Sequence, residues 1–209
     1  SQAAEITATL VADVRQNGDE AVVRYMRRWT DQDFTADRIV VTADELAGAE
    51  ERLEPSLREA ILTGIEHIRA YQQHIAPQKP KAIEIGGARL GLRFNPVDSV
   101  GLTVPGGTAP LFSTLMMLAV PAQVAGVPSD RITVVNPPPT TRPGQPAGDI
   151  SASVLATAKL LGIERVFRIG GAQAVAALAF GTERVPSVDM IAGPGNVYVQ
   201  QAKQQIAGI

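Results

Sequence analysis

The sequence predicts an α/β fold in which a parallel sheet carries helices on both faces, preceded by a mostly helical N-terminal part and a β-hairpin. From Val100 onward, short apolar runs alternate four times with helical patterns, which is typical of a parallel sheet covered by helices. The first 75 residues instead carry apolar side chains at helical spacing. We therefore expect two parts: residues 1–98, with the hairpin, and a Rossmann-like domain in residues 99–209.

The composition argues against several classes of protein. Of the 209 residues, 45% are apolar and 19% are charged, and the net charge is -2, as in an ordinary globular protein. There is no basic surplus and aromatic residues make up only 4%, so we expect no nucleic-acid partner. Prolines interrupt the richest apolar stretch, so we expect no membrane span. Cysteine is absent, which excludes disulfides and thiolate metal sites and fits a cytoplasmic protein.

Helices dominate the expected N-terminal part. The Asn17-Gly18-Asp19 sequence breaks the first helical pattern and starts a second. Apolar and aromatic side chains recur there at helical spacing: Val22, Tyr25, Met26 and Trp29. Thr42 and Glu45 have the spacing of a capping box. Pro55 lies in the first turn of a further helix, whose inward side should include Tyr71.

The next segment changes character and predicts a β-hairpin. Short runs at residues 82–85 and 90–94 flank the Gly86-Gly87 pair. The hairpin should join the helical part to the sheet.

The four apolar runs predict four parallel strands, at residues 101–104, 132–135, 166–169 and 188–191. After the first strand, Pro105, Gly106 and Gly107 supply a turn and Thr108 is a candidate N-cap. The helix that follows runs to about Ala125 and is apolar on most sides, so it should lie between the sheet and another layer.

Glycine and amide residues follow these strands on one edge of the expected sheet. The loops read PGG, NPPP, GGAQ and GPGN. The carboxyl ends of parallel strands meet at one edge, where α/β proteins bind their ligands. Glycines let backbone N–H groups approach an anion, and the amides of Gln173 and Asn196 can donate to ribose or phosphate oxygens. The loops therefore predict a nucleotide or phosphate site, although each glycine loop taken alone could be only structural.

No catalytic or metal-ligating residue can be assigned from the sequence. Neither G-x-G-x-x-G after the first strand nor G-x-x-x-x-G-K-S/T is present. The sheet half contains no histidine, and no carboxylate pair stands at a strand end to act as acid and base. His67 and His74 are seven residues apart on a helix, too far to hold one metal ion as a pair. Lys203 is expected to extend into solvent.

Several long segments closely resemble the histidinol dehydrogenase family. They are VGLTVPGGTAPLFSTLMMLAVPAQVAGV, FRIGGAQAVAALAFGTERVPSVDMIAGPGNVYV and QAKQQIAG, with RQNGDEAVVRYMRRWT and IEHIRAYQQ in the helical part. The resemblance implies a cytoplasmic homodimer that uses zinc and NAD to oxidise L-histidinol to L-histidine through the aldehyde, in histidine biosynthesis.

The resemblance also implies roles for particular residues. Gln173 and Asn196 match family positions that contact NAD, and Thr103 stands where the family usually has tyrosine. The expected NAD-binding residues are thus Thr103, Gln173, Asn196, Gly106 and Gly107. The family's zinc ligands, catalytic Glu-His pair and most substrate contacts lie in a later half that nothing here matches. We therefore expect the cofactor-binding half of the enzyme, with an incomplete first domain and no activity alone.

Two alternative functions stay open. Thr103 and the proline-rich insert at residues 137–148 could signal a related dehydrogenase for another alcohol. The lack of acid–base groups near the glycine loops would also suit a non-catalytic nucleotide-binding or assembly module.

Overall fold

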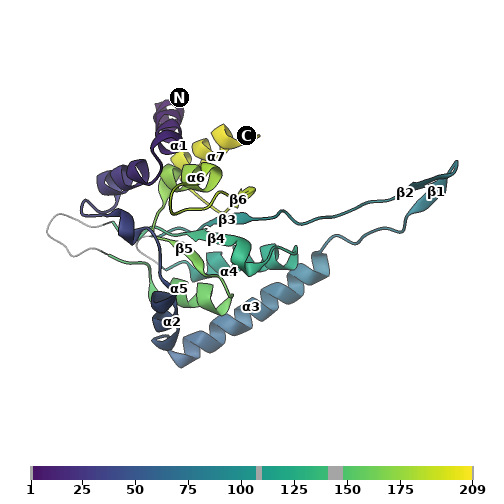
Figure 1. Ribbon diagram of the computed structural model, residues 1–209. Helices are drawn as coiled ribbons and strands as arrows, with labels where there is room; N and C mark the ends of the chain where they lie inside the picture. Colours follow the sequence, from purple (N-terminus) through teal and green to yellow (C-terminus); the bar gives the residue numbers. More distant parts are fainter. Residues whose placement is uncertain (1, 107–109, 141–147, 209) are drawn as a thin grey trace.

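A four-stranded parallel sheet lies between two layers of helices in a computed structural model that describes residues 2–106, 110–140 and 148–208 (Figure 1). The strands are β3 (Val100–Thr103), β4 (Ile132–Val135), β5 (Arg165–Phe167) and β6 (Met190–Ala192). Their order is β5-β4-β3-β6, and every neighbouring pair is parallel. The predicted α/β class is confirmed.

Helices cover both faces of the sheet, as predicted. One face carries α1 (Gln2–Trp29), α6 (Gly171–Phe180) and α7 (Val197–Ile206), which pack on one another. The other carries α2 (Ala43–Glu51), α3 (Pro55–Ile75), α4 (Phe112–Val124) and α5 (Ala152–Leu160). Two short 3-10 helices, Ala36–Arg38 and Ser129–Arg131, complete the helices that the structure describes.

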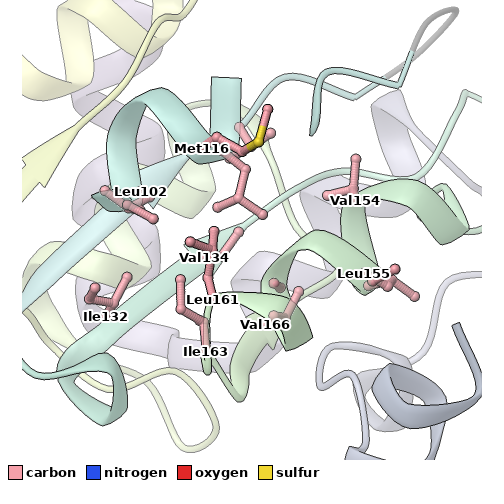
Figure 2. Close-up of a cluster of buried hydrophobic side chains, with 14 of the residues drawn as sticks. Leu102, Met116, Ile132, Val134, Val154, Leu155, Leu161, Ile163 and Val166 are labelled. Carbon is pink, nitrogen blue, oxygen red and sulfur yellow. The ribbon is translucent and has the colours of Figure 1, made fainter. Parts of the chain in front are cut away.

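The central strands are continuous apolar runs because both of their faces are covered. Every residue of β3 and β4 is buried. Figure 2 shows part of the core on the α4 and α5 side, to which β3, β4 and both helices contribute. The helix α4 packs between β3 and α3, as its apolar sequence predicts. In the described part of the chain, no helix combines the length and apolarity needed to cross a bilayer.

The N-terminal helices follow the sequence signals closely. Gly18 interrupts α1 with a φ of 50° and a ψ of -131°. The Thr42 side chain accepts from the Glu45 N–H, and the Glu45 carboxylate accepts from the Thr42 N–H at 2.7 Å, so the predicted capping box is present. The expectation for Tyr71 is wrong, because it lies 62% exposed near the end of α3, where that helix extends beyond the body (Figure 1).

The helices before residue 99 also cover the sheet domain. Although far away in sequence, α1 packs on α6 and α7, α2 on α5, and α3 on α4. The boundary between residues 98 and 99 stays a prediction.

The predicted hairpin is present as an arm that projects far from the body (Figure 1). Strand β1 (Ile83–Ile85) pairs antiparallel with β2 (Ala88–Leu90) around Gly86 and Gly87, whose φ values are 59° and 82°. We call residues 77–98 the arm; every one of them is exposed. Its exposed large apolar side chains are Ile83, Ile85, Leu90, Leu92, Phe94 and Val97.

Candidate functional site

The strand order places a crossover point at one edge of the sheet. The chain runs outward from β3 to β4 and β5, then returns across the sheet to β6 on the other side of β3. Ligands of open α/β sheets bind beside the carboxyl ends of the strands at such a reversal. The loops after β3 and β6 flank this point.

The loops after β3, β4 and β5 touch one another at this edge. A Cβ atom on Gly106 would lie 1.9 Å from the Pro137 carbonyl oxygen. A Cβ atom on Gly170 would lie 2.5 Å from Cγ of the same proline. Side chains at either position would drive the loops apart, so glycine is required for close approach.

Thr103 supports the loop after β6. Thr103 is only 8% exposed. Its hydroxyl donates to the Ala192 carbonyl at 3.3 Å and to the Pro194 carbonyl at 3.2 Å. A Cβ atom on Gly193, whose φ is 123°, would lie 2.3 Å from the Thr103 carbonyl oxygen. The end of β3 and the GPGN loop are therefore in direct contact.

Asn136 fixes the loop after β3 and was missed in the sequence. It is 2% exposed, and its Nδ2 donates to the carbonyls of Val104 at 2.9 Å and Pro105 at 3.0 Å. Two hydrogen bonds to backbone carbonyls hold the turn rigid. The signal available was the asparagine at the start of NPPP, directly after a buried strand.

A cavity of about 700 Å³ opens at this edge, within the usual range for small-molecule sites. Its wall combines the glycine loops with one side of α1, and its lining is Ile6, Thr7, Thr9, Leu10, Tyr25, Arg28, Trp29, Thr30, Gly106, Pro137, Pro138, Thr140, Gly170, Gly171, Ala172, Gln173, Asn196 and Tyr198. Three predicted residues, Gly106, Gln173 and Asn196, are thus brought together. Thr103 is not among the described residues that line the cavity, and Gly107 and the candidate N-cap Thr108 fall outside the described residues.

Both predicted amides keep donor groups available to a ligand. The Asn196 Oδ1 accepts from the N–H groups of Tyr198 and Val199, both at 3.1 Å, and so caps α7. Its Nδ2 has no partner in the described part of the chain. Gln173 is 3% exposed in the first turn of α6, and its Nε2 makes only a weak contact with the Met26 sulfur at 3.6 Å.

The expectation that Lys203 extends into solvent is wrong. Its Nζ donates to the Gly193 carbonyl at 2.5 Å. Burial lowers the pKa of this ammonium group. Because α7 packs against the loop that precedes it, the lysine stem lies along the protein and ties the helix to the GPGN loop.

The wall supplied by α1 was also missed. The sequence places Tyr25 and Trp29 at helical spacing, and Arg28 falls on the same side. The periodicity indicates that these side chains share one face of the helix, but it does not indicate which part of the molecule that face contacts. In the structure the face borders the cavity, and Arg28 is the one charged residue in the described lining.

A buried charged network lies beside this edge. Arg168 is 4% exposed; its Nε donates to Asp149 at 2.7 Å, one Nη to Glu45 at 2.5 Å and the other to the Val40 carbonyl at 2.8 Å. Burial acts to lower the pKa of Arg168. The hydrogen bonds to Asp149 and Glu45 and the charge of these carboxylates outweigh the effect of burial, so the pKa of Arg168 is raised. The network joins α2 to the end of β5.

The described residues do not fit a metal ion. No group of three or more histidine, cysteine, aspartate or glutamate side chains comes together within residues 2–106, 110–140 and 148–208. His67 and His74 are both exposed on α3. We therefore derive no chemical step through zinc from these residues.

The chain is similar to known proteins along its whole length. A family model described as histidinol dehydrogenase matches residues 1–209. A histidinol dehydrogenase of Gluconobacter oxydans is 41% identical over 208 residues, which cover 98% of this chain and 46% of that protein. A histidinol dehydrogenase of Caulobacter vibrioides is 43% identical over 202 residues, which cover 97% of this chain and 45% of that protein.

A solved structure agrees with this similarity. The crystal structure of histidinol dehydrogenase from Elizabethkingia anophelis matches with a TM-score of 0.86 and 35% identity, over 97% of this chain and 44% of that one. The chain thus spans about half the length of the relatives it matches.

Proposed function

The chain belongs to the histidinol dehydrogenase family, and we propose that the cavity at the carboxyl edge of its sheet binds NAD. On this proposal the chain is the cofactor-binding part of a cytoplasmic enzyme that oxidises L-histidinol to L-histidine through the aldehyde. One observation carries the proposal: glycine loops and the amides of Gln173 and Asn196 meet around a cavity of about 700 Å³ at the crossover point. Bound NAD supplies a hydride acceptor.

The residues of this chain would bind and orient the cofactor. Gly106 and Gly170 let the loops after β3 and β5 pack closely on Pro137 at the cavity, where their backbone N–H groups would face the diphosphate, and Gly107 follows Gly106 in sequence. Gln173 and Asn196 would donate to ribose or phosphate oxygens. Thr103 would act through the GPGN loop that its hydroxyl contacts, because a threonine is too short to replace the tyrosine ring.

We infer that zinc and the acid–base groups of the reaction are held by the part of the relatives that this chain does not span. This inference follows from the lack of fit to a metal among the described residues and from the coverage of 45% and 46%. The chain alone should bind NAD without turning over histidinol.

We expect Asn196→Ala to weaken NAD binding about tenfold in calorimetric titration, because a hydrogen bond to a charged or polar ligand is lost. The same substitution removes the cap of α7 and so costs about 1 kcal/mol of stability. Asn196→Ser separates the two effects, since serine caps the helix but has no amide. Asn196→Ser should restore the stability and leave NAD binding weak. If NAD binding also recovered in Asn196→Ser, the role of Asn196 would be only to cap α7. No heat with the unaltered chain would contradict NAD binding.

A longer version of the protein, supplied with zinc, distinguishes the remaining functions. Formation of NADH from histidinol supports the proposed reaction. Formation of NADH from another alcohol only would favour a related dehydrogenase. Binding of NAD without turnover of any alcohol would favour a nucleotide-binding or assembly module.

We further infer that the arm contributes to a homodimer. A two-stranded hairpin is marginal alone, and the arm that carries this one exposes Ile85, Leu92 and Phe94 by 59%, 57% and 56%. Replacing these three residues by serine should shift the protein from dimer to monomer in sedimentation analysis. Serine at Met117 and Met190, which are 56% and 52% exposed on the body, serves as the matched control. An unaltered chain that sediments as a monomer would contradict this inference.

A further inference from the structure

We propose that α1 forms the second wall of the cofactor site and that Arg28 pairs with the diphosphate of the bound dinucleotide. This inference rests on the proposed function and deepens it, because it assigns the charge recognition to a helix outside the sheet domain. Two parts of α1 line the cavity that the glycine loops border: Ile6, Thr7, Thr9 and Leu10 near its start, and Tyr25, Arg28 and Trp29 near its end.

The wall is held in place by contacts with the sheet domain. Met26 of α1 is fully buried and lies 3.6 Å from Nε2 of Gln173, at the start of α6. Asp19 of α1 pairs with Arg184 at 2.6 Å. Gln205 of α7 donates to the Ala4 carbonyl at 2.9 Å. The position of α1 relative to the glycine loops is therefore fixed along the helix.

Charge singles out Arg28 on this wall. It is the one charged residue in the described lining, whose other members are apolar, glycine, hydroxyl or amide residues. A dinucleotide diphosphate carries two negative charges, and a planar guanidinium with several N–H groups suits such oxygens better than an ammonium does. The other arginines near it have different partners: Arg24 pairs with Asp13 and Glu20, and Arg27 donates to the Phe34 carbonyl. Within the described chain Arg28 has no acidic partner.

An aromatic stack positions the guanidinium. Its carbon lies 5.5 Å from the centre of the Trp29 ring, and that ring stacks on Tyr25 at 5.2 Å with an interplanar angle of 13°. A cation–π contact uses the face of the guanidinium and leaves its N–H donors for a ligand. Trp29, which stays 44% exposed at the cavity, is thus a positioning residue for Arg28.

The test compares Arg28→Gln with Arg15→Gln in calorimetric titrations of NAD, ADP and adenosine. Arg15 is the matched control, because it lies on the same helix and covers the Phe180 ring at 5.1 Å without lining the cavity. We expect Arg28→Gln to weaken NAD and ADP about 10- to 100-fold and adenosine less than about twofold. Arg15→Gln should leave all three unchanged. The NAD and ADP affinities of Arg28→Lys should lie between those of the unaltered chain and Arg28→Gln, since lysine keeps the positive charge and loses the planar set of N–H donors.

The single tryptophan gives a second readout that does not depend on activity. Trp29 is the only tryptophan in the chain, so its fluorescence should change when ADP moves the guanidinium on its ring, and this change should vanish in Arg28→Gln. Equal NAD affinity in the unaltered chain and Arg28→Gln would overturn the role of Arg28 and leave the NAD site standing. An equal loss of affinity for ADP and for adenosine in Arg28→Gln would also overturn the role of Arg28, because Arg28 would then not recognise phosphate. No binding of NAD by the unaltered chain would instead remove the proposed function itself.

Discussion

Gly193→Ala is expected to reduce NAD affinity at least about 100-fold and to lower the free energy of unfolding by about 2–4 kcal/mol. Gly193 has a φ of 123°, where side chains are strained, and an added Cβ would lie 2.3 Å from the Thr103 carbonyl oxygen and 2.5 Å from its hydroxyl oxygen. The GPGN loop would have to move away from β3. That movement would break the Lys203 contact with the Gly193 carbonyl and displace Asn196 three residues later.

Gly87→Ala is the matched control for backbone strain. Gly87 also has a positive φ, 82°, but nothing lies within 4 Å of an added Cβ in the arm. Its replacement should cost about 1 kcal/mol and leave NAD affinity unchanged. Calorimetry and chemical denaturation on both variants measure the difference. If the two variants behave alike, the contact between the GPGN loop and Thr103 does not hold the site together.

The sequence was sufficient where a signal is local. Continuous apolar runs identified β3 and β4, because strands buried on both faces must be apolar throughout. The Thr42 and Glu45 spacing identified a helix start, and glycine and amide residues after strands identified Gly106, Gln173 and Asn196 as neighbours of one cavity. Each of these signals depends on a few adjacent residues.

Strand ends were less predictable, because partners outside the sheet decide them. The last strand was expected at residues 188–191 but begins at Met190. The Val188 N–H donates to the Leu178 carbonyl and the Asp189 N–H to the Ser99 hydroxyl, so these two residues are bonded elsewhere. The third strand, expected at residues 166–169, ends at Phe167, and the N–H of Arg168 donates instead to the Ile39 carbonyl.

Long-range packing was beyond the reach of sequence patterns. The strand order and the wall formed by α1 depend on which surfaces meet, and helical periodicity only says that a face exists. Arg168 and Glu45, which are 123 positions apart, illustrate the same point: nothing near either residue indicates the other. A buried arginine after a strand is a visible signal only once its partners are known.

Arg168→Met should lower the free energy of unfolding by about 3 kcal/mol in chemical denaturation. Methionine keeps much of the volume but leaves the Val40 carbonyl and the carboxylates of Glu45 and Asp149 without their shared donor. The loss stays below the largest values for buried pairs, because the two acidic side chains are 43% and 57% exposed and can be hydrated. Arg24→Met is the control: the Arg24 side chain is 47% exposed whereas that of Arg168 is 5% exposed, so water screens the pairs of Arg24 with Asp13 and Glu20 and their loss should cost less than about 1 kcal/mol.

The same network should make the free energy of unfolding depend on pH in the acid range. This dependence is an independent test of the pairing between Arg168 and Glu45. Burial acts to raise the pKa of Glu45, but hydrogen bonds from Thr42 and the charge of Arg168 outweigh it and hold the pKa below its ordinary value of 4.5. A carboxyl with a lowered pKa in the folded state stabilises the protein above about pH 4.5 and loses that contribution as the pH falls through the lowered pKa. Denaturation at a series of pH values from about 6 to 3 should therefore show a steeper loss of stability in the unaltered chain than in Arg168→Met. Parallel curves for the two proteins would mean that Arg168 does not hold Glu45 ionised, and the stability lost in Arg168→Met would then come from the Val40 carbonyl and packing alone.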